Sequence, residues 1–205
     1  MRYRTALSRY MLFTMAVAIT ATFAAAAFAQ QQPTRIRGVI ERVEGNALIV
    51  RSGEVETKIV VADDPQIYGV VKATLADVKI NSFVGVGAMP QTDGSQKALQ
   101  LMIFAETQRG LGEGHRPWTQ PGSTMTNGTV DMTVAGVEGQ VLLVKYKGGE
   151  QKIIVTPDTV MRAYVVGERS ELKPSAQIAT FATKRPDGSF ETSRINVGRD
   201  GVAPQ

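Results

Sequence analysis

The sequence predicts an all-β protein made of two tandem five-stranded OB-like barrels. These are small Greek-key barrels, each with a short helical turn between its third and fourth strands. Three observations predict this fold. The chain of 205 residues matches itself at an offset of 94 residues, its apolar residues alternate with polar ones in short runs, and Gly, Asn, Asp and Pro separate those runs at close intervals.

The internal match rests on two tripeptides. Val43–Gly45 recurs as Val137–Gly139, and Asp93–Ser95 recurs as Asp187–Ser189. Both pairs have the same offset, so the sequence between them matches without a gap. A repeat of this length predicts two copies of one structural unit.

The repeat sets the expected domain boundaries. We expect a cleaved signal peptide, a first barrel, an ordered connecting loop, a second barrel and a flexible tail, at residues 1–29, 30–105, 106–127, 128–198 and 199–205. Each barrel has about 70 residues, which is near the lower limit for an independent core. We therefore expect the two halves to pack against each other and to unfold together.

Each half begins with three expected strands. Runs rich in Val, Ile and Thr, bounded by turn residues, predict strands at 36–43, 47–50, 56–61, 129–137, 140–146 and 151–156. Gly148-Gly149 is expected to form a hairpin turn between the last two. Asp63-Asp64 stands before Pro65, so turn chemistry is expected to end the third strand of the first half there.

A short helical turn and two more strands complete each half. Thr74–Lys79 and Ser170–Pro174 have the composition of a single capped helical turn. Asp-Gly then joins alternating apolar runs at 83–89, 96–104, 178–183 and 190–197, which predicts a closing hairpin in each half. A pair of small β-sandwiches or SH3-like barrels has the same strand count and stays open as an alternative.

These residues carry a family resemblance. The first half contains Gly-Val, Val-x-Gly-x-x-Leu-x-Val, a Val/Ile strand that ends at Asp, Leu-Ala-Asp-Val-Lys and Asp-Gly-Ser, all within Gly38–Phe104. This pattern resembles exported bacterial β-barrel domains catalogued as domain of unknown function 5666. Gly128–Val197 follows it more loosely, with Glu171 in place of the Asp. The resemblance implies a barrel fold and supplies no catalytic residue.

The first residues predict export. Arg2, Arg4 and Arg9 precede an apolar stretch, and Ala27-Phe28-Ala29 has the pattern of a signal peptidase site. Cleavage there would release a periplasmic chain through the general secretory path. The alternative is an uncleaved membrane anchor, because the stretch is as long as a spanning helix.

The charge argues against nucleic-acid binding. The whole chain carries a net charge of +4, and residues 1–29 hold three Arg and no acidic residue, so the remainder carries 20 − 19 = +1. Phosphate binding needs a denser basic surface. No stretch after Ala29 is apolar enough to predict a membrane span.

One segment has no counterpart in the repeat. Residues 106–127 contain the only His and the only Trp of the chain, His115 and Trp118. In one interpretation Trp118 is a hydrophobic plug that fixes the loop. In a second, Trp118, His115, Arg116 and Glu113 form a recognition surface for a sugar or a peptide. In a third, His115 binds a metal ion together with Met125 or Glu113.

The residue types disfavour an enzyme. The chain has no Cys and one His, and it lacks a Gly-x-Ser-x-Gly elbow and a phosphate-binding loop. We expect an exported, non-enzymatic binding or scaffold protein of the envelope that uses no cofactor. A glycan or an envelope protein is the expected partner. A metal-binding protein is the alternative, and a hydrolase a lesser one.

Overall fold

The computed structural model describes residues 32–136 and 139–204. The expected signal peptide and the Val137-Glu138 part of the repeat lie outside the described residues. The described chain is all-β, and its helical segments are single 3₁₀ turns. None of its helices is long and apolar enough to cross a membrane.

The strands follow the order of the sequence runs. They are β1 (Thr34–Glu44), β2 (Ala47–Ser52), β3 (Val55–Lys72), β4 (Phe83–Pro90), β5 (Gln96–Ile103), β6 (Gly114–Pro117), β7 (Thr124–Gly136), β8 (Gly139–Tyr146), β9 (Gly149–Val155), β10 (Val160–Val166), β11 (Gln177–Lys184) and β12 (Phe190–Gly198). The 3₁₀ turns are η1 (Leu75–Asp77), η2 (Glu106–Gln108) and η3 (Arg169–Glu171).

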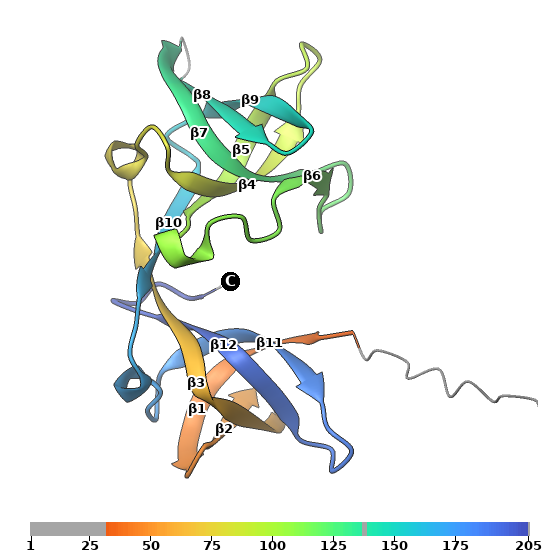
Figure 1. Ribbon diagram of the computed structural model, residues 1–205, viewed down its shortest axis with the longest axis vertical. Coiled ribbons are helices and arrows are strands. Elements are labelled where there is room, and N and C mark those ends of the chain that lie inside the picture. The colour runs from red at the N-terminus through yellow and green to blue at the C-terminus, as the bar shows by residue number, and fades with distance from the viewer. Residues whose placement is uncertain (1–31, 137–138, 205) are drawn as a thin grey trace, which may run out of the picture. The chain divides into compact units, whose positions relative to one another are not determined.

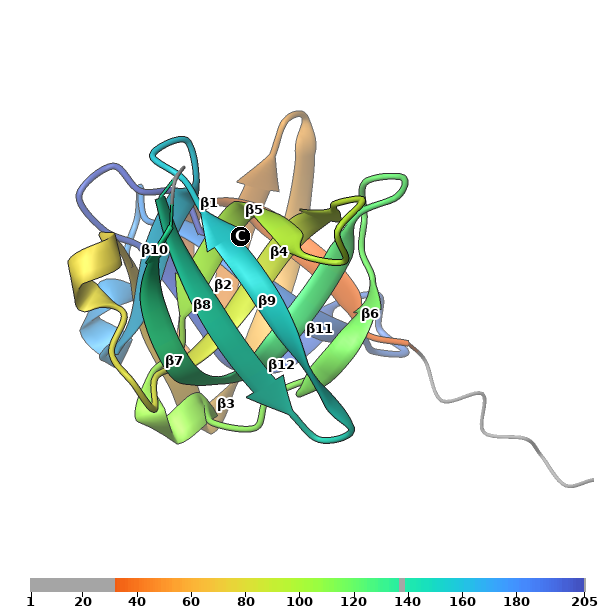
Figure 2. The ribbon, with the colours of Figure 1, turned by 90° about the horizontal axis from the view of Figure 1, so that it is seen from above.

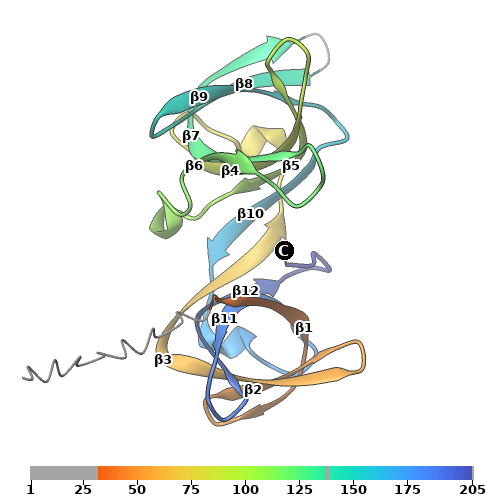
Figure 3. The same cartoon turned by 90° about the vertical axis from the view of Figure 1, so that its right-hand side faces the viewer.

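Five strands close a first ring. Strand β1 pairs with β2, β2 with β3, β12 with β11 and β11 with β1, all antiparallel. The ring closes through a parallel pairing of β3 with β12. Figure 3 shows these strands curving around one core, so they form a closed five-stranded barrel.

The remaining pairings close a second ring. Strand β4 pairs with β5 and β7, and β8 pairs with β7 and β9, all antiparallel. A short parallel contact of Gln96 and Lys97 with Ile153 and Ile154 joins β5 to β9. Figure 2 shows these strands arranged around a common axis. Strand β6 pairs with β7 outside the ring.

The ring membership differs from the expected domains. The first ring takes β1–β3 from the first half of the sequence and β11–β12 from the second. The second ring takes β7–β9 from the second half and β4–β5 from the first. Residues 30–105 and 128–198 therefore do not each form their own barrel. The two halves exchange their last two strands.

The path of β3 explains the exchange. The third strand does not end at Asp63-Asp64, as the sequence predicted, but continues to Lys72. Residues 62–65 form a bulge, because the pairing with β12 jumps from Val61 and Thr192 to Gln66 and Arg194. Arg169 donates from Nη2 to the carbonyl oxygens of Ala62 and Asp63 at 2.7 and 3.1 Å. The bulge absorbs the extra residues, and the strand leaves the first ring without a turn.

Strand β10 joins the two rings and was absent from the sequence prediction. It pairs antiparallel with the end of β3, from Arg162 opposite Lys72 to Val166 opposite Tyr68, and parallel with β5. Val70 and Tyr164 lie at the centre of this antiparallel register and are themselves 94 residues apart. Figure 1 shows β3 and β10 side by side where the chain passes between the rings.

Each ring has its own apolar core, and each core mixes the two halves. The first contains Ile40, Ile59, Ile178 and Ile195, all at most 1% exposed. The second is built in the same way around Val84, Leu101, Leu142, Ile153 and their neighbours. Burial of both cores therefore requires both halves of the chain.

The predictions of turns from neighbouring residues agree with the structure more closely than the predicted strand pairing does. The two Asp-Gly hairpins form as expected, and each Asp accepts hydrogen bonds from the Ser that follows, at Asp93 with Ser95 and Asp187 with Ser189. The first helical turn is η1, where Thr74 donates to Asp77 as the capping pattern predicted. The second, expected at Ser170–Pro174, is η3 at Arg169–Glu171, and Glu168 N donates to Glu171 there.

Candidate functional site

A cavity of about 750 Å³ lies along β10, and we call it the β10 cavity. Four segments line it: the end of β3 with η1, the start of β8, the residues from the end of β9 into β10, and the C-terminal segment. These segments comprise 72–75, 139–140, 155–157 with 159–162, and 201–203. This volume is within the usual range for sites that enclose a small molecule.

A short turn connects β9 to β10 at the rim of the cavity. Within this turn Thr156 N donates to Thr159 Oγ1 at 3.1 Å, and Thr159 N donates to the Thr156 carbonyl at 3.0 Å. Thr159 Oγ1 also donates to the Ala98 carbonyl of β5 at 3.0 Å. These bonds hold the rim of the cavity against the second ring.

The C-terminal segment forms another wall. The sequence interpretation treated residues 199–205 as a flexible tail, but Arg199 N donates to the Val70 carbonyl at 3.1 Å and Pro204 is buried. The Arg199 guanidinium lies on Gly69 and donates to both carboxylate oxygens of Glu171, at 2.6 and 2.8 Å. This pair holds the pKa of Glu171 below its ordinary value. Gly201–Ala203 are thereby brought to the cavity.

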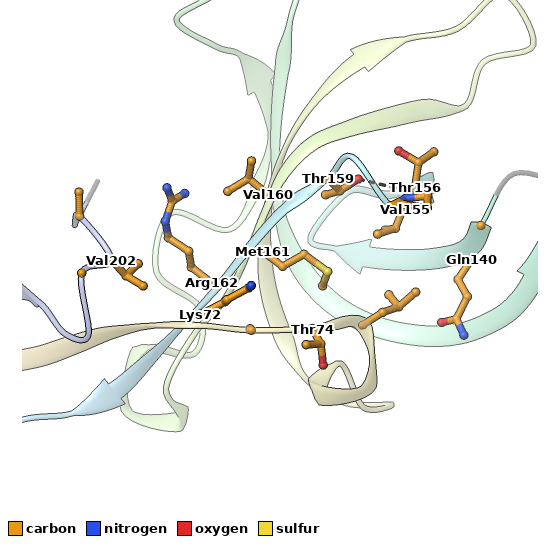
Figure 4. Close-up of a pocket in the computed structure, with 16 residues that line it drawn as sticks. Lys72, Thr74, Gln140, Val155, Thr156, Thr159, Val160, Met161, Arg162 and Val202 are labelled. Atoms are coloured by element: carbon orange, nitrogen blue, oxygen red, sulfur yellow. Dashed lines mark hydrogen bonds between the residues drawn. The ribbon is translucent and has the colours of Figure 1, made fainter.

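The cavity has a cationic end and an apolar middle. Figure 4 shows Arg162 with Val202 at one end, Met161 in the middle, and Gln140 and Thr156 at the other end. Lys72 lies opposite Arg162 in the pairing of β3 with β10. Within the described chain, neither cationic side chain donates a hydrogen bond or forms an ion pair.

The other polar groups of the lining are hydroxyls and one amide. They belong to Thr74, Gln140, Thr156 and Thr159. Thr156 Oγ1 is buried and has no hydrogen-bond partner among the described residues. The described lining residues include no His, Asp or Glu that could act as a general base.

The loop residues singled out from the sequence lie elsewhere, on the second ring. Trp118 is half-buried and lies on Gly87 of β4, where an added Cβ would be 2.6 Å from the indole ring. His115 is on β6, where its Nδ1 is 2.9 Å from Thr126 Oγ1 and its ring stacks on Tyr146 with centroids 6.2 Å apart.

Arg116 and Glu113 each bond to the backbone. Arg116 Nη1 donates to the Gly112 carbonyl at 2.8 Å, and Glu113 Oε1 accepts the Lys147 backbone N–H at 2.9 Å. Trp118, His115 and Glu113 thus contact the second ring, whereas the Arg116 bond lies within the 106–127 segment. Among residues 32–136 and 139–204, no three His, Cys, Asp or Glu side chains gather as metal ligands would.

Sequence reasoning missed the β10 cavity altogether. Its lining residues come from four separated segments and share no motif. Tyr68 of β3 and Tyr164 of β10 pack against each other, with ring centroids 6.2 Å apart. Burial raises the pKa of Tyr164, although Arg35, Arg162 and Arg194 act on it in the opposite direction.

No protein-family model, curated protein or solved structure gives a significant match to the chain.

Proposed function

We propose that the protein is an exported, non-enzymatic binding protein of the bacterial envelope that holds a small ligand in the β10 cavity. The observation that carries this proposal is the cavity itself. It combines an apolar middle with a few polar groups at its two ends, which is the usual composition of ligand sites. The described lining has no His, Asp or Glu, which favours binding over acid–base hydrolysis.

We further propose that both rings are OB-like and arose by duplication. In each ring the parallel contact joins the third strand of one half to the last strand of the other. A 3₁₀ turn stands between the third and fourth strands of each half, counting β10 as the continuation of β9. Five strands in this arrangement are the layout of the OB-fold, whose members commonly bind ligands.

The two halves differ at positions that line the β10 cavity. At two of the positions 94 residues from its lining, the side chain is engaged elsewhere. Arg169, which corresponds to Leu75, donates to the carbonyls of Ala62 and Asp63. Tyr68, which corresponds to Arg162, is 3% exposed, and its hydroxyl lies 3.1 Å from Thr107 Oγ1. The corresponding residues of the other half, Leu75 and Arg162, line the β10 cavity.

We also propose where the protein is located and what the 106–127 loop binds. The basic and apolar residues at the start of the chain support a periplasmic address, and the resemblance to domain of unknown function 5666 supports an exported barrel. A glycan or an envelope protein remains the proposed partner of the 106–127 loop. An array of glycans and peptides probed with the wild type and with Trp118→Ala tests that part separately.

The test of the proposed function is a fluorine NMR screen of a fluorinated fragment library. We expect fragments to bind the wild type and to lose binding in the Leu75→Arg variant. This substitution introduces the residue type of Arg169, which corresponds to Leu75 in the repeat. Ile80→Arg is the matched control, because Ile80 is 63% exposed, lies in the same segment and is outside the lining.

Ala203→Trp blocks the same cavity from its opposite wall and covers the case in which Leu75→Arg fails to fold. Fragments that bind equally to the wild type and to both blocking variants would contradict the proposal, and so would a screen without any bound fragment.

A further inference from the structure

We propose that the β10 cavity binds an amphipathic oxyanion, a molecule with an apolar body and one carboxylate or phosphate group. This inference rests on the proposed function and specifies its ligand. The oxyanion would lie at Lys72 and Arg162, and the apolar body would extend past Met161 toward the Gln140 end.

The first argument is electrostatic. Lys72 and Arg162 are direct cross-strand partners in the antiparallel pairing of β3 with β10. Like charges in that position repel each other and destabilise a sheet. No carboxylate among the described residues pairs with either side chain. An oxyanion bound between them would convert the repulsion into two charge-assisted hydrogen bonds.

The second argument is a contrast within the molecule. Among the strand pairings of the described residues, Lys72 with Arg162 is the one pair in which two cations face each other, whereas Arg51 faces Glu56 and Lys145 faces Glu150. In the first ring the residues that correspond to Lys72 and Arg162 are Val166 and Tyr68, which are uncharged. The facing cations therefore have no charged counterpart at the positions related by the repeat.

The third argument concerns the rest of the ligand. Beyond the two cations the lining is mainly aliphatic, with Leu75, Val155, Val160, Met161 and Val202. Methionine adapts its shape to apolar ligands, since its side chain is unbranched and polarizable. A small inorganic anion would leave this surface uncovered, whereas an apolar body attached to the anion would bury it.

Isothermal titration with four twelve-carbon probes tests the inference, at concentrations below those at which they form micelles. Dodecanoate and dodecyl phosphate carry the two forms of oxyanion, dodecanol carries no charge, and dodecylammonium carries the opposite charge. We expect at least one oxyanion probe to bind about tenfold more tightly than dodecanol, and dodecylammonium to bind most weakly. The stronger of the two oxyanion probes identifies the head group.

Charge-removing variants locate the head group. Lys72→Gln and Arg162→Gln should each weaken binding of the preferred oxyanion about tenfold and leave dodecanol binding unchanged. Lys147→Gln removes the same charge from an exposed turn outside the lining and should change nothing. Lys72 is exposed, so its replacement keeps the test usable if Arg162→Gln fails to fold.

The outcomes separate this inference from the proposed function. Equal affinities for dodecanoate, dodecyl phosphate and dodecanol would overturn the oxyanion inference, and so would affinities that Lys72→Gln and Arg162→Gln leave unchanged. If fluorinated fragments occupy the cavity but no twelve-carbon probe binds, the oxyanion inference fails and the proposed function stands. If neither fragments nor probes bind, the proposed function fails as well.

Discussion

The exchange of strands between the halves predicts which engineered disulfide will form. Val39 of β1 lies opposite Gln177 of β11 in the antiparallel register, and both residues are exposed. Cα atoms of such partners are about 4.5–5.5 Å apart, which a disulfide can span. The chain contains no Cys, so Val39→Cys with Gln177→Cys introduces the only possible pair.

The size of the effect follows from the loop that the bridge closes. Positions 39 and 177 are 138 residues apart (177 − 39). Restricting a loop of that length in the unfolded chain stabilises the folded state by about 5 kcal/mol in the chain-entropy treatment, and strain in the folded state lowers this value. We therefore expect the oxidised double variant to melt well above its reduced form.

Non-reducing electrophoresis, peptide mass mapping and thermal denaturation with and without reductant measure the outcome. Val39→Cys with Phe83→Cys is the matched control, since position 83 lies 94 residues before position 177 and would face Val39 if the first half closed its own ring. In the structure Phe83 pairs with Thr129 of the second ring instead. A bridge between positions 39 and 83, with none between 39 and 177, would refute the exchange.

Three further predictions concern single residues. Ile195→Ala should lower the free energy of unfolding by about 2–5 kcal/mol, because Ile195 is fully buried in the first core. Calorimetry of this variant should show a single transition, since each core contains residues of both halves. Gly87→Ala should displace the indole of Trp118, which red-shifts the fluorescence of the only Trp, and should cost about 1–3 kcal/mol through overpacking. Glu171→Gln should cost about 1–2 kcal/mol at neutral pH, because the carboxylate loses its charge-assisted bonds to Arg199. The pKa of Glu171 is lowered from 4.5 in the folded chain, so this stabilisation is present above pH 4.5 and disappears as the pH falls through the lowered pKa. A difference in unfolding free energy between wild type and Glu171→Gln that persists below the lowered pKa would contradict the role given to the carboxylate.

Local structure could be predicted from the sequence because its causes are local. The Asp-Gly-Ser turns at Asp93 and Asp187 form through hydrogen bonds between neighbouring residues, and Thr74 and Asp77 cap their turn in the same way. Strand runs follow from the alternation of apolar and polar residues. All of these signals lie within a few residues of the structure that they determine.

The choice of pairing partners could not be predicted in this way. The two copies of the fourth strand, β4 and β11, share buried apolar residues at Val84 and Ile178 and at Ala88 and Ala182, so local pattern does not decide which of them pairs with β1. What decides the pairing is whether the chain turns after Val61 or continues. The bulge at Asp63-Asp64 and the contact of Arg169 with the carbonyls before Pro65 let it continue. That contact joins residues more than a hundred positions apart, beyond the reach of local patterns.

The cavity was missed for a related reason. The differences between Leu75 and Arg169, and between Arg162 and Tyr68, are visible when the two halves are aligned. Their meaning depends on knowing that Arg169 reaches Ala62 and that Tyr68 is buried beside Thr107. Sequence reasoning instead chose the segment that does not repeat. There Trp118, His115 and Glu113 contact the second ring, and Arg116 donates to the Gly112 carbonyl of the same segment.

A crystal structure of the protein with its preferred twelve-carbon oxyanion is the most direct test of the binding site. We predict density for the alkyl chain along Met161, with the oxyanion within hydrogen-bonding distance of both Lys72 Nζ and the Arg162 guanidinium. Density for the probe at another surface, with the β10 cavity occupied only by water, would contradict the account.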